Sequence, residues 1–313
     1  MRLVFCGTPQ FAVPTLEALL SAGHTVQLLL TQPDRPSGRG MDVKLSAVKL
    51  FAQQHGLQIA QPEKIRNNLP LQKQLTEIAP DAILVVAYGR LIPAWMLALS
   101  RFGNLNLHAS LLPKYRGAAP IQWALANGEI ETGVTTMRID EGLDTGDILL
   151  QQRVPILPDQ TSVELSPVLA NVGAVLMVKT LAGLENGTLL ATPQEHGQAT
   201  LAPILQREEG RIEWNCTARQ IFNRWRGFQP WPGAFTLFRG KKLSLHAMRV
   251  ADSGLELQVA PPGMLARNGN HLLVACGAGT WLEALELQLE GKRRMPVDAF
   301  LNGLAFTPGE WLG

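Results

Sequence analysis

The chain has 313 residues, with 28 Lys and Arg against 26 Asp and Glu, for a net charge of +2. Its hydrophobic content of 46% and charged content of 17% exclude an intrinsically disordered protein and predict about two folded domains. Cys6, Cys216 and Cys276 are far apart, and the six histidines show no metal-ligand spacing. We therefore expect neither a disulfide framework nor a structural metal.

The chain enters a predicted strand almost at once, so we expect no signal peptide. We find no apolar run near the roughly 18 residues that a membrane span needs. These observations predict a cytoplasmic protein that does not enter a membrane.

The first two thirds of the chain alternate between strand and helix patterns. We expect strands at 3–7, 24–31, 56–60, 81–87, 104–108, 133–140 and 148–154, and helices at 8–20, 46–55, 69–79, 93–99, 118–128 and 161–184. This alternation favours a Rossmann-like, mostly parallel sheet with helices on both faces. The first turn has only one glycine of the GxGxxG fingerprint, which argues against a nicotinamide-dependent enzyme.

The last third of the chain has a different pattern. Periodicity is lost at 187–203, and we expect a catalytic domain at 1–188, a linker at 189–206 and a second domain at 207–313. Short strands at 235–238, 242–250, 255–259, 271–275 and 281–288 favour an OB-like β-barrel. Residues 206–249 carry nine basic and three acidic side chains, which suits a polyanionic partner.

The strand at 104–108 ends in the sequence Asn106-Leu-His108. Strand alternation places Asn106 and His108 on one face, with Leu105 and Leu107 on the other. Ligands of such sheets bind beyond the carboxyl ends of strands. This stretch alone is equally compatible with a structural histidine and with a catalytic one.

An acidic loop follows the strand at 133–140. It contains Asp140, Asp144 and Asp147 with two glycines, and its spacing differs from that of an EF-hand. We expect one of these aspartates to face His108.

The segment 32–40 has the proline and glycine content of a loop. It carries Arg35 and Arg39, and Lys44 follows it. These cations suit a grip on a phosphate backbone, although an ordinary surface loop would look similar.

The pattern Asn106-x-His108-x-Ser-Leu-Leu-Pro113, followed by Leu143-Asp-Thr-Gly-Asp147, resembles the folate-dependent formyltransferases. The segments at 32–40, 116–122, 131–135 and 228–232 are similar to the branch of that family that acts on charged tRNA. The resemblance implies transfer of a formyl group from 10-formyltetrahydrofolate to the α-amino group of methionyl initiator tRNA. It also implies a catalytic domain and a C-terminal OB-type domain that binds tRNA.

The resemblance also implies roles for single residues. The catalytic positions are Asn106, His108 and Asp144; the folate site includes Ser110, Leu111, Leu112 and Pro113; and a tRNA contact comes from Arg39, to which we add Arg35 on the same segment and Lys44 beyond it. The chain departs from its relatives at Met41 and Asp42, where a lysine pair is frequent, and at Ile204, where a lysine is common. Pro167 falls in an expected helix, where proline is tolerated only in the first turn.

The chemistry is consistent with these positions. Formyl transfer between nitrogens passes through a tetrahedral oxyanion, and each donor aimed at that oxygen contributes about 3 kcal/mol. Asn106 and His108 carry such donors. A carboxylate such as Asp144 favours imidazolium and helps move the proton of the attacking amine. We expect a monomer that needs no metal.

Two other classes of function remain open. The same chemistry could act on an amino sugar nucleotide, or the formyl donor could be hydrolysed. Alternatively, the chain could be a nucleic-acid-binding module that has lost catalysis. The arginine segment and the basic C-terminal region favour tRNA, and the retention of Asn106, His108 and Asp144 argues against lost catalysis.

Overall fold

The computed structural model describes residues 1–37, 42–251, 258–303, 307 and 309–313, and the chain divides into two compact units. The N-terminal unit comprises Met1–Pro120, Glu131–Pro155 and Glu164–Pro203. The C-terminal unit comprises Ile121–Ile130, Ile156–Val163 and Ile204–Gly313. Two short segments from the first 163 residues are therefore part of the C-terminal unit.

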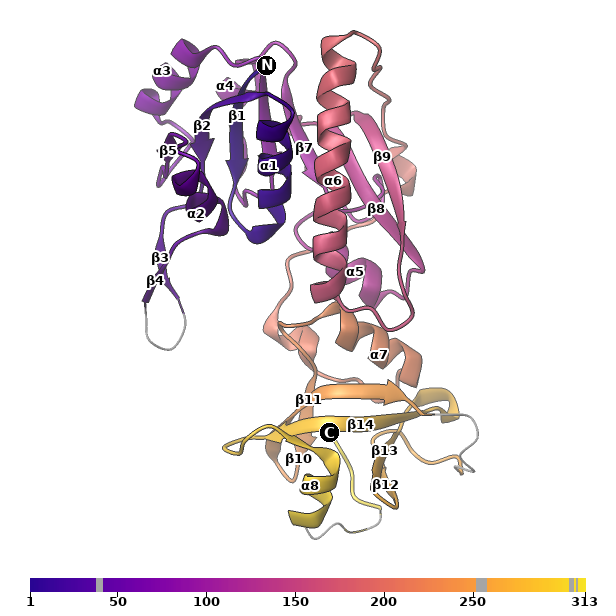
Figure 1. The fold of residues 1–313 in the computed structure, drawn as a ribbon. Coiled ribbons are helices and arrows are strands. Elements are labelled where there is room, and N and C mark those ends of the chain that lie inside the picture. The colour runs from indigo at the N-terminus through magenta and orange to yellow at the C-terminus, as the bar shows by residue number, and fades with distance from the viewer. Residues whose placement is uncertain (38–41, 252–257, 304–306, 308) are drawn as a thin grey trace. The chain divides into compact units, whose positions relative to one another are not determined.

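The N-terminal unit is organised around a seven-stranded sheet with the strand order β5-β2-β1-β6-β7-β8-β9 (Figure 1). Its strands are β1 (Arg2–Gly7), β2 (Thr25–Leu30), β5 (Ile59–Ala60), β6 (Ala82–Val86), β7 (Asn104–His108), β8 (Glu131–Arg138) and β9 (Ile148–Pro155). The strands from β5 to β7 run parallel, whereas β8 and β9 are antiparallel to their neighbours. The expectation of a mostly parallel Rossmann-like sheet is confirmed.

The central strands are apolar along their whole length because helices cover the sheet. Every residue of β6 is buried, as are five of the six residues of β1. The covering helices are α1 (Val13–Ser21), α2 (Ala47–Gln54), α3 (Leu69–Ile78), α4 (Ala94–Leu97) and α6 (Ser162–Glu185), with the short 3-10 turns η1 (Gln10–Ala12) and η2 (His196–Gln198).

Helix α6 packs closely on β7 and β8. A Cβ on Gly173 would lie 2.6 Å from a methyl carbon of Leu107, so glycine is needed for this approach. The hydroxyls of Thr136 in β8 and Thr180 in α6 are 2.7 Å apart. Pro167 is the sixth helical residue and not in the first turn as expected; it is exposed, and so is Val163, whose carbonyl can bond to water.

By length and composition, α6 is long and apolar enough to cross a membrane, contrary to the expectation that no segment of the chain is. Half of its most apolar 18-residue window (50%) is buried within the protein. A helix that covers a sheet has this composition, because one face must match the apolar strands. In Figure 1, α6 runs along the sheet beside β7, β8 and β9.

Part of the segment expected as a loop forms a hairpin. Strands β3 (Arg35–Ser37) and β4 (Asp42–Lys44) pair antiparallel, with Arg35 opposite Lys44. An ion pair between Lys49 and Asp34 fixes the base of the hairpin. Proline and glycine content indicated a loop, but such residues are tolerated in a two-stranded ribbon with open edges.

The C-terminal unit contains an antiparallel sheet with the order β10-β11-β14-β13-β12. Its strands are β10 (Phe235–Phe238), β11 (Lys241–Val250), β12 (Leu265–Asn268), β13 (His271–Ala275), β14 (Trp281–Leu289) and β15 (Met295–Pro296), which pairs with β14. Leu312 bridges to Phe238 and Trp311 bridges to Met264, so the end of the chain joins the two edge regions of the sheet. This curled antiparallel sheet confirms the expected OB-like fold.

The helical elements of this unit are α5 (Pro120–Ala126), α7 (Ala218–Gly227) and α8 (Val297–Gly303), with the 3-10 turns η3 (Arg207–Gly210) and η4 (Gly277–Gly279). Helix α5 and helix α7 are in contact: a Cβ on Gly227 would lie 2.6 Å from the carbonyl oxygen of Gln122. The rings of Trp123 and Phe228 meet edge to face at 5.3 Å. Strands β12 and β15 and helix α8 were not expected, and residues 255–257 of the expected strand at 255–259 lie outside the described residues.

The segment 189–203, which we expected within a linker, is hydrogen-bonded to the N-terminal unit. Thr192 exchanges two backbone hydrogen bonds of 2.8 Å with Ile148 at the start of β9. The backbone N–H of Arg116 donates to Thr200, and that of Ala202 donates to Arg116. This segment thus lies against the loop that follows β7.

Candidate active site

Strand β7 places two polar side chains at one end of the parallel part of the sheet. Asn106 is partly exposed and His108 is 6% exposed, while Leu105 and Leu107 are buried among apolar neighbours. In register, Asn106 lies between Val85 of β6 and Met137 of β8. The strand alternation expected from the sequence is therefore present.

Asp144 lies between these two side chains and belongs to the loop that joins β8 and β9. Its Oδ1 is 3.4 Å from Nδ2 of Asn106, and its Oδ2 is 3.6 Å from Nδ1 of His108. The backbone N–H of Gly117 donates to the same Oδ2 at 2.8 Å. The expectation that one aspartate of this loop faces His108 is confirmed.

Among the described residues, neither of the other two loop aspartates pairs with His108. Asp140 accepts hydrogen bonds from the backbone of Gly142 and the hydroxyl of Thr145, at 3.0 and 2.7 Å, so it shapes the turn. The backbone carbonyl of Asp147 accepts from the N–H of Arg138.

The ring of His108 has both nitrogens directed at oxygen atoms. Nε2 is 2.9 Å from the backbone carbonyl of Tyr115, so Nε2 carries a proton and donates it. Nδ1 faces Asp144 at 3.6 Å, which is within ion-pair range but too long for a hydrogen bond. In the doubly protonated ring, the Nδ1–H is therefore still available to an incoming oxygen atom.

The four residues expected in the folate site follow His108 directly. Ser110 is fully buried, and its hydroxyl donates to the carbonyl of Lys114 at 2.6 Å. Leu112 is also buried, and its backbone N–H donates to Thr135. Leu111 and Pro113 are partly exposed. A ligand can therefore meet the side chains of Leu111 and Pro113, whereas those of Ser110 and Leu112 are turned into the protein.

Two buried polar residues hold the loop that carries Asp144, and the sequence does not predict this role for either of them. Arg116 contacts Gln194, and Gln194 contacts the backbone of Asp144. Arg116 belongs to a segment that matched the formyltransferase pattern, but nothing in the spacing connects it to Gln194. Gln194 lies in the segment 189–206, which the sequence predicts to be a linker.

Two of the three cations expected to contact tRNA, Arg35 and Lys44, are carried by the β3–β4 hairpin. Arg35 and Lys44 are both exposed and lie opposite each other in the two strands. Arg39, Met41 and the turn of this hairpin lie outside the described residues, so the expectation for Arg39 stays a prediction.

We find no metal-binding cluster in the described ranges: nowhere in them do three or more His, Cys, Asp or Glu side chains gather as an ion would need. His108 and Asp144 form a pair and not a cluster of three.

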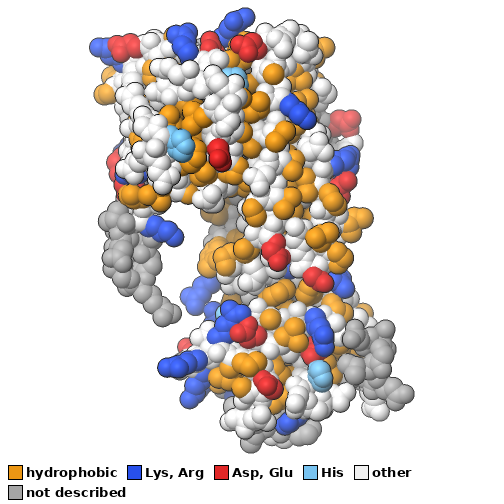
Figure 2. Space-filling model, viewed as in Figure 1, with side chains coloured by type: hydrophobic (Ala, Val, Ile, Leu, Met, Phe, Trp, Pro, Cys, Tyr) orange, Lys and Arg blue, Asp and Glu red, His pale blue; other side chains and the backbone are white. Residues whose placement is uncertain are grey.

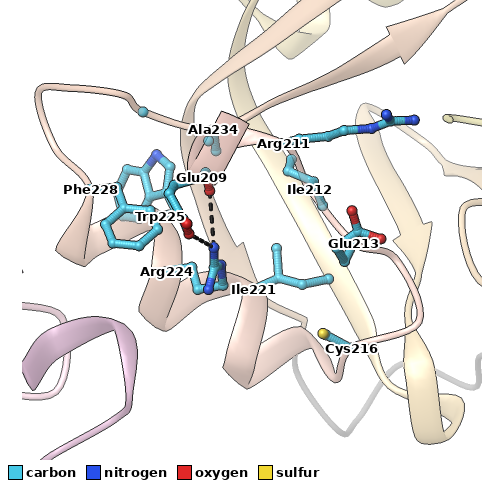
Figure 3. Close-up of a pocket in the computed structure, with 12 residues that line it drawn as sticks. Glu209, Arg211, Ile212, Glu213, Cys216, Ile221, Arg224, Trp225, Phe228 and Ala234 are labelled. Atoms are coloured by element: carbon cyan, nitrogen blue, oxygen red, sulfur yellow. Dashed lines mark hydrogen bonds and ion pairs between the residues drawn. The ribbon is translucent and has the colours of Figure 1, made fainter. Parts of the chain in front are cut away.

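The C-terminal unit has a cavity of about 170 Å³ between helix α7 and the segment that precedes β10. Figure 3 shows Glu209 and Arg224 joined at one side of this cavity and Arg211 directed away from it. The Glu209 carboxylate is 2.7 Å from the Arg224 guanidinium. Trp225, Phe228 and Ile221 provide apolar walls.

Two family profiles match the chain. The profile described as "Formyl transferase" matches residues 1–181, and "Formyl transferase, C-terminal domain" matches residues 204–305. A protein of Acidobacterium capsulatum named methionyl-tRNA formyltransferase is 63% identical over 313 residues, covering 100% of both chains. A protein of the same name from Caldanaerobacter subterraneus is 45% identical over 304 residues, covering 97% of each.

Solved structures share the fold at low identity. WlaRD, a sugar 3N-formyl transferase crystallised with dTDP and 5-N-formyl-THF, has a TM-score of 0.65 at 20% identity and covers 94% of this chain and 99% of its own. HypX from Aquifex aeolicus in complex with tetrahydrofolic acid has a TM-score of 0.61 at 17% identity and covers 96% of this chain and 47% of its own. Both profiles and the relatives of full length lead to one conclusion: the chain belongs to the formyl transferase family.

Proposed function

We propose that this chain transfers the formyl group of 10-formyltetrahydrofolate to the α-amino group of methionyl initiator tRNA, giving formylmethionyl-tRNA for translation initiation. The observation that carries the proposal is Asp144 lying between Asn106 and His108 at the end of β7. Relatives named methionyl-tRNA formyltransferase, which match this chain from end to end, support the choice of acceptor.

In the proposed reaction, the free amine of the aminoacyl-tRNA attacks the formyl carbon. The new C–N bond turns the formyl oxygen into an oxyanion, and the Nδ2–H of Asn106 and the Nδ1–H of His108 donate to it. Each such donor contributes about 3 kcal/mol. The intermediate then collapses, the bond between the formyl carbon and N10 of the folate breaks, and tetrahydrofolate leaves.

Asp144 accepts and then donates the transferred proton in this scheme. The attacking amine must lose one proton as the C–N bond forms, and the leaving nitrogen must gain one as its bond breaks. The Asp144 carboxylate lies beside both donors and accepts the proton before passing it to N10. The net reaction needs no oxidant and no metal.

The folate site follows from the same loop. Leu111 and Pro113 offer partly exposed apolar surface next to His108, and the pterin end of the folate has a flat ring that such surface suits. WlaRD and HypX were both crystallised with folate derivatives, which supports a folate donor for a chain of the same fold.

The charge of the protein supports tRNA as the acceptor, as does its similarity to the relatives. Arg35 and Lys44 lie on the β3–β4 hairpin, Arg39 lies between these two strands in the sequence, and residues 206–249 have a net charge of +6. Figure 2 shows Lys and Arg side chains spread over the visible face of the C-terminal unit, with some acidic ones between them. A nucleotide sugar requires no such surface, whereas a tRNA backbone is bound through its phosphates.

We also propose that the enzyme acts as a cytoplasmic monomer that does not enter the membrane.

A single assay tests the function. The purified protein and 10-formyltetrahydrofolate are incubated with charged initiator tRNA, with an amino sugar nucleotide, or with no acceptor. We expect formylmethionine on the tRNA and no formyl release in the other two reactions. Transfer to the amino sugar alone, or release to water alone, would refute the proposal.

Loss of the hairpin cations should weaken tRNA binding without slowing the chemistry. We expect Arg35→Ala and Arg39→Ala each to raise the KM for tRNA about tenfold, the effect of losing one charge-assisted contact. The salt dependence of binding should fall by about one ion per arginine. Steady-state kinetics over a range of salt concentrations measures both quantities. Lys73→Ala removes an equally exposed charge from α3 and should change neither; unchanged tRNA kinetics in the arginine variants would exclude the hairpin from binding.

A further inference from the structure

A buried arginine and a buried glutamine lie next to the loop that carries Asp144. Arg116 is 7% exposed and Gln194 is 6% exposed. Nε and Nη2 of Arg116 donate to Oε1 of Gln194, at 3.1 and 2.6 Å. Nη2 is also 3.0 Å from Nδ1 of His196. Within the described part of the chain, no carboxylate pairs with Arg116, so this cation is held by neutral partners.

The other end of the Gln194 amide holds the backbone of the loop. Its Nε2 donates to the carbonyl of Asp144 at 2.9 Å and to the carbonyl of Gly146 at 2.7 Å. The amide cannot be turned over. Its NH₂ would then face the guanidinium of Arg116, and its oxygen would face two carbonyls. Arg116 thus fixes which end of Gln194 meets the loop.

Asp144 needs such support because its backbone is left-handed. Its φ is +51°, a conformation that costs a residue with a side chain about 1–2 kcal/mol. Neighbouring groups must therefore hold it in place. The same short segment holds Asp144 from two sides: the N–H of Gly117 donates to its carboxylate, and Arg116 acts on its carbonyl through Gln194.

We propose that Gln194 is a positioning residue that fixes the Asp144 carboxylate between Asn106 and His108, with Arg116 setting the orientation of the Gln194 amide. Gln194 contacts the backbone of Asp144 and not its carboxylate, so it acts through the loop. This inference rests on the proposed formyl transfer, in which Asp144 moves the proton.

We therefore expect the loss of Gln194 to lower kcat and to leave the binding of both substrates unchanged. The folate and the tRNA are bound by other groups, so their affinities do not depend on Gln194. A reacting group that is displaced by about 1 Å can cost about 100-fold in rate. Without Gln194, the left-handed turn at Asp144 loses two hydrogen bonds, and the carboxylate is no longer held at one place.

Two substitutions at Gln194 and one control test the inference. Gln194→Met keeps the length of the side chain and removes every hydrogen bond. Gln194→Glu keeps the acceptor for Arg116 but places an oxygen against the two carbonyls. Gln198→Met makes the same change at an exposed glutamine four residues away, whose side-chain amide contacts Glu195.

We expect kcat to fall about 100-fold in Gln194→Met and in Gln194→Glu, with the KM for both substrates within about threefold of wild type. Gln198→Met should match wild type. Hydrogen exchange of a peptide covering 141–147 should be faster in both Gln194 variants than in wild type and in Gln198→Met. This readout is independent of activity.

The outcomes separate the inference from the proposed function. If the wild-type protein does not formylate charged tRNA, the proposed function is wrong, while hydrogen exchange still reports on the loop. If wild type is active and both Gln194 variants keep kcat within threefold, the inference is wrong. If Gln194→Met does not fold, Gln194→Glu decides the question, because it retains the bond to Arg116.

Discussion

Asp144→Asn should lower the kcat of formyl transfer about 10³-fold, within the range that a general base contributes. Asparagine has the same size and keeps an oxygen for the N–H of Gly117, so the loop should retain its shape. What it loses is the ability to accept the proton of the attacking amine. Folate binding, measured by fluorescence titration, should stay within about threefold of wild type, because Asp144 lies against Asn106 and His108.

Asp147→Asn is the matched control for this variant. It makes the same chemical change three residues further along the same loop, at a residue that makes no contact with Asn106 or His108 among the described residues. Its kcat should be close to that of wild type. A wild-type rate in Asp144→Asn would remove Asp144 from the mechanism. Equal losses in both variants would instead indicate that the charge of the loop matters and not the position of one carboxylate.

Asn106→Leu should lower kcat by about 10²- to 10³-fold, the effect of removing one donor to an oxyanion. Leucine has the same branched shape as asparagine, and within the described part of the chain the one hydrogen bond that the Asn106 amide would lose is the 3.4 Å contact with Asp144. The fold should therefore be retained. Single-turnover kinetics with prebound folate isolates the chemical step.

Asn104→Leu provides the comparison for Asn106→Leu. Asn104 lies two residues earlier on the same face of β7, is 2% exposed, and its Nδ2 makes no hydrogen bond to any described residue. Its replacement should leave kcat unchanged. A rate for Asn106→Leu that equals the rate for Asn104→Leu would show that Asn106 is not a donor to the oxyanion.

Much of the N-terminal unit could be predicted because burial imposes simple patterns. Strands such as β1 and β6 are covered on both faces, so they read as continuous apolar runs. Strand β7 shows alternation because one of its faces carries Asn106 and His108. The same alternation indicated, correctly, that these two side chains lie on one face.

The features that the sequence does not predict depend mostly on which segments of the chain meet in three dimensions. Gln194 lies in a stretch without periodicity, and only the three-dimensional fold brings it to Asp144 and Arg116. The β3–β4 hairpin depends on pairing, which proline and glycine content does not report. Helix α6 has an apolar face toward the sheet and apolar residues on its other faces. Polar residues are spread among them, so no uninterrupted apolar run in the sequence indicates a helix long and apolar enough to span a membrane.

The assignment of α5 to the C-terminal unit has a consequence for biosynthesis. Ile121, Ala124, Leu125 and Ala126 of α5 are buried, and α7 contacts this helix through Gly227. A ribosome therefore delivers α5 long before the helix it packs against. Its apolar face stays uncovered while β8, β9 and α6 are being translated, so the C-terminal unit completes its core only near the end of synthesis. A nascent chain that stalls after residue 203 would expose that face to other proteins.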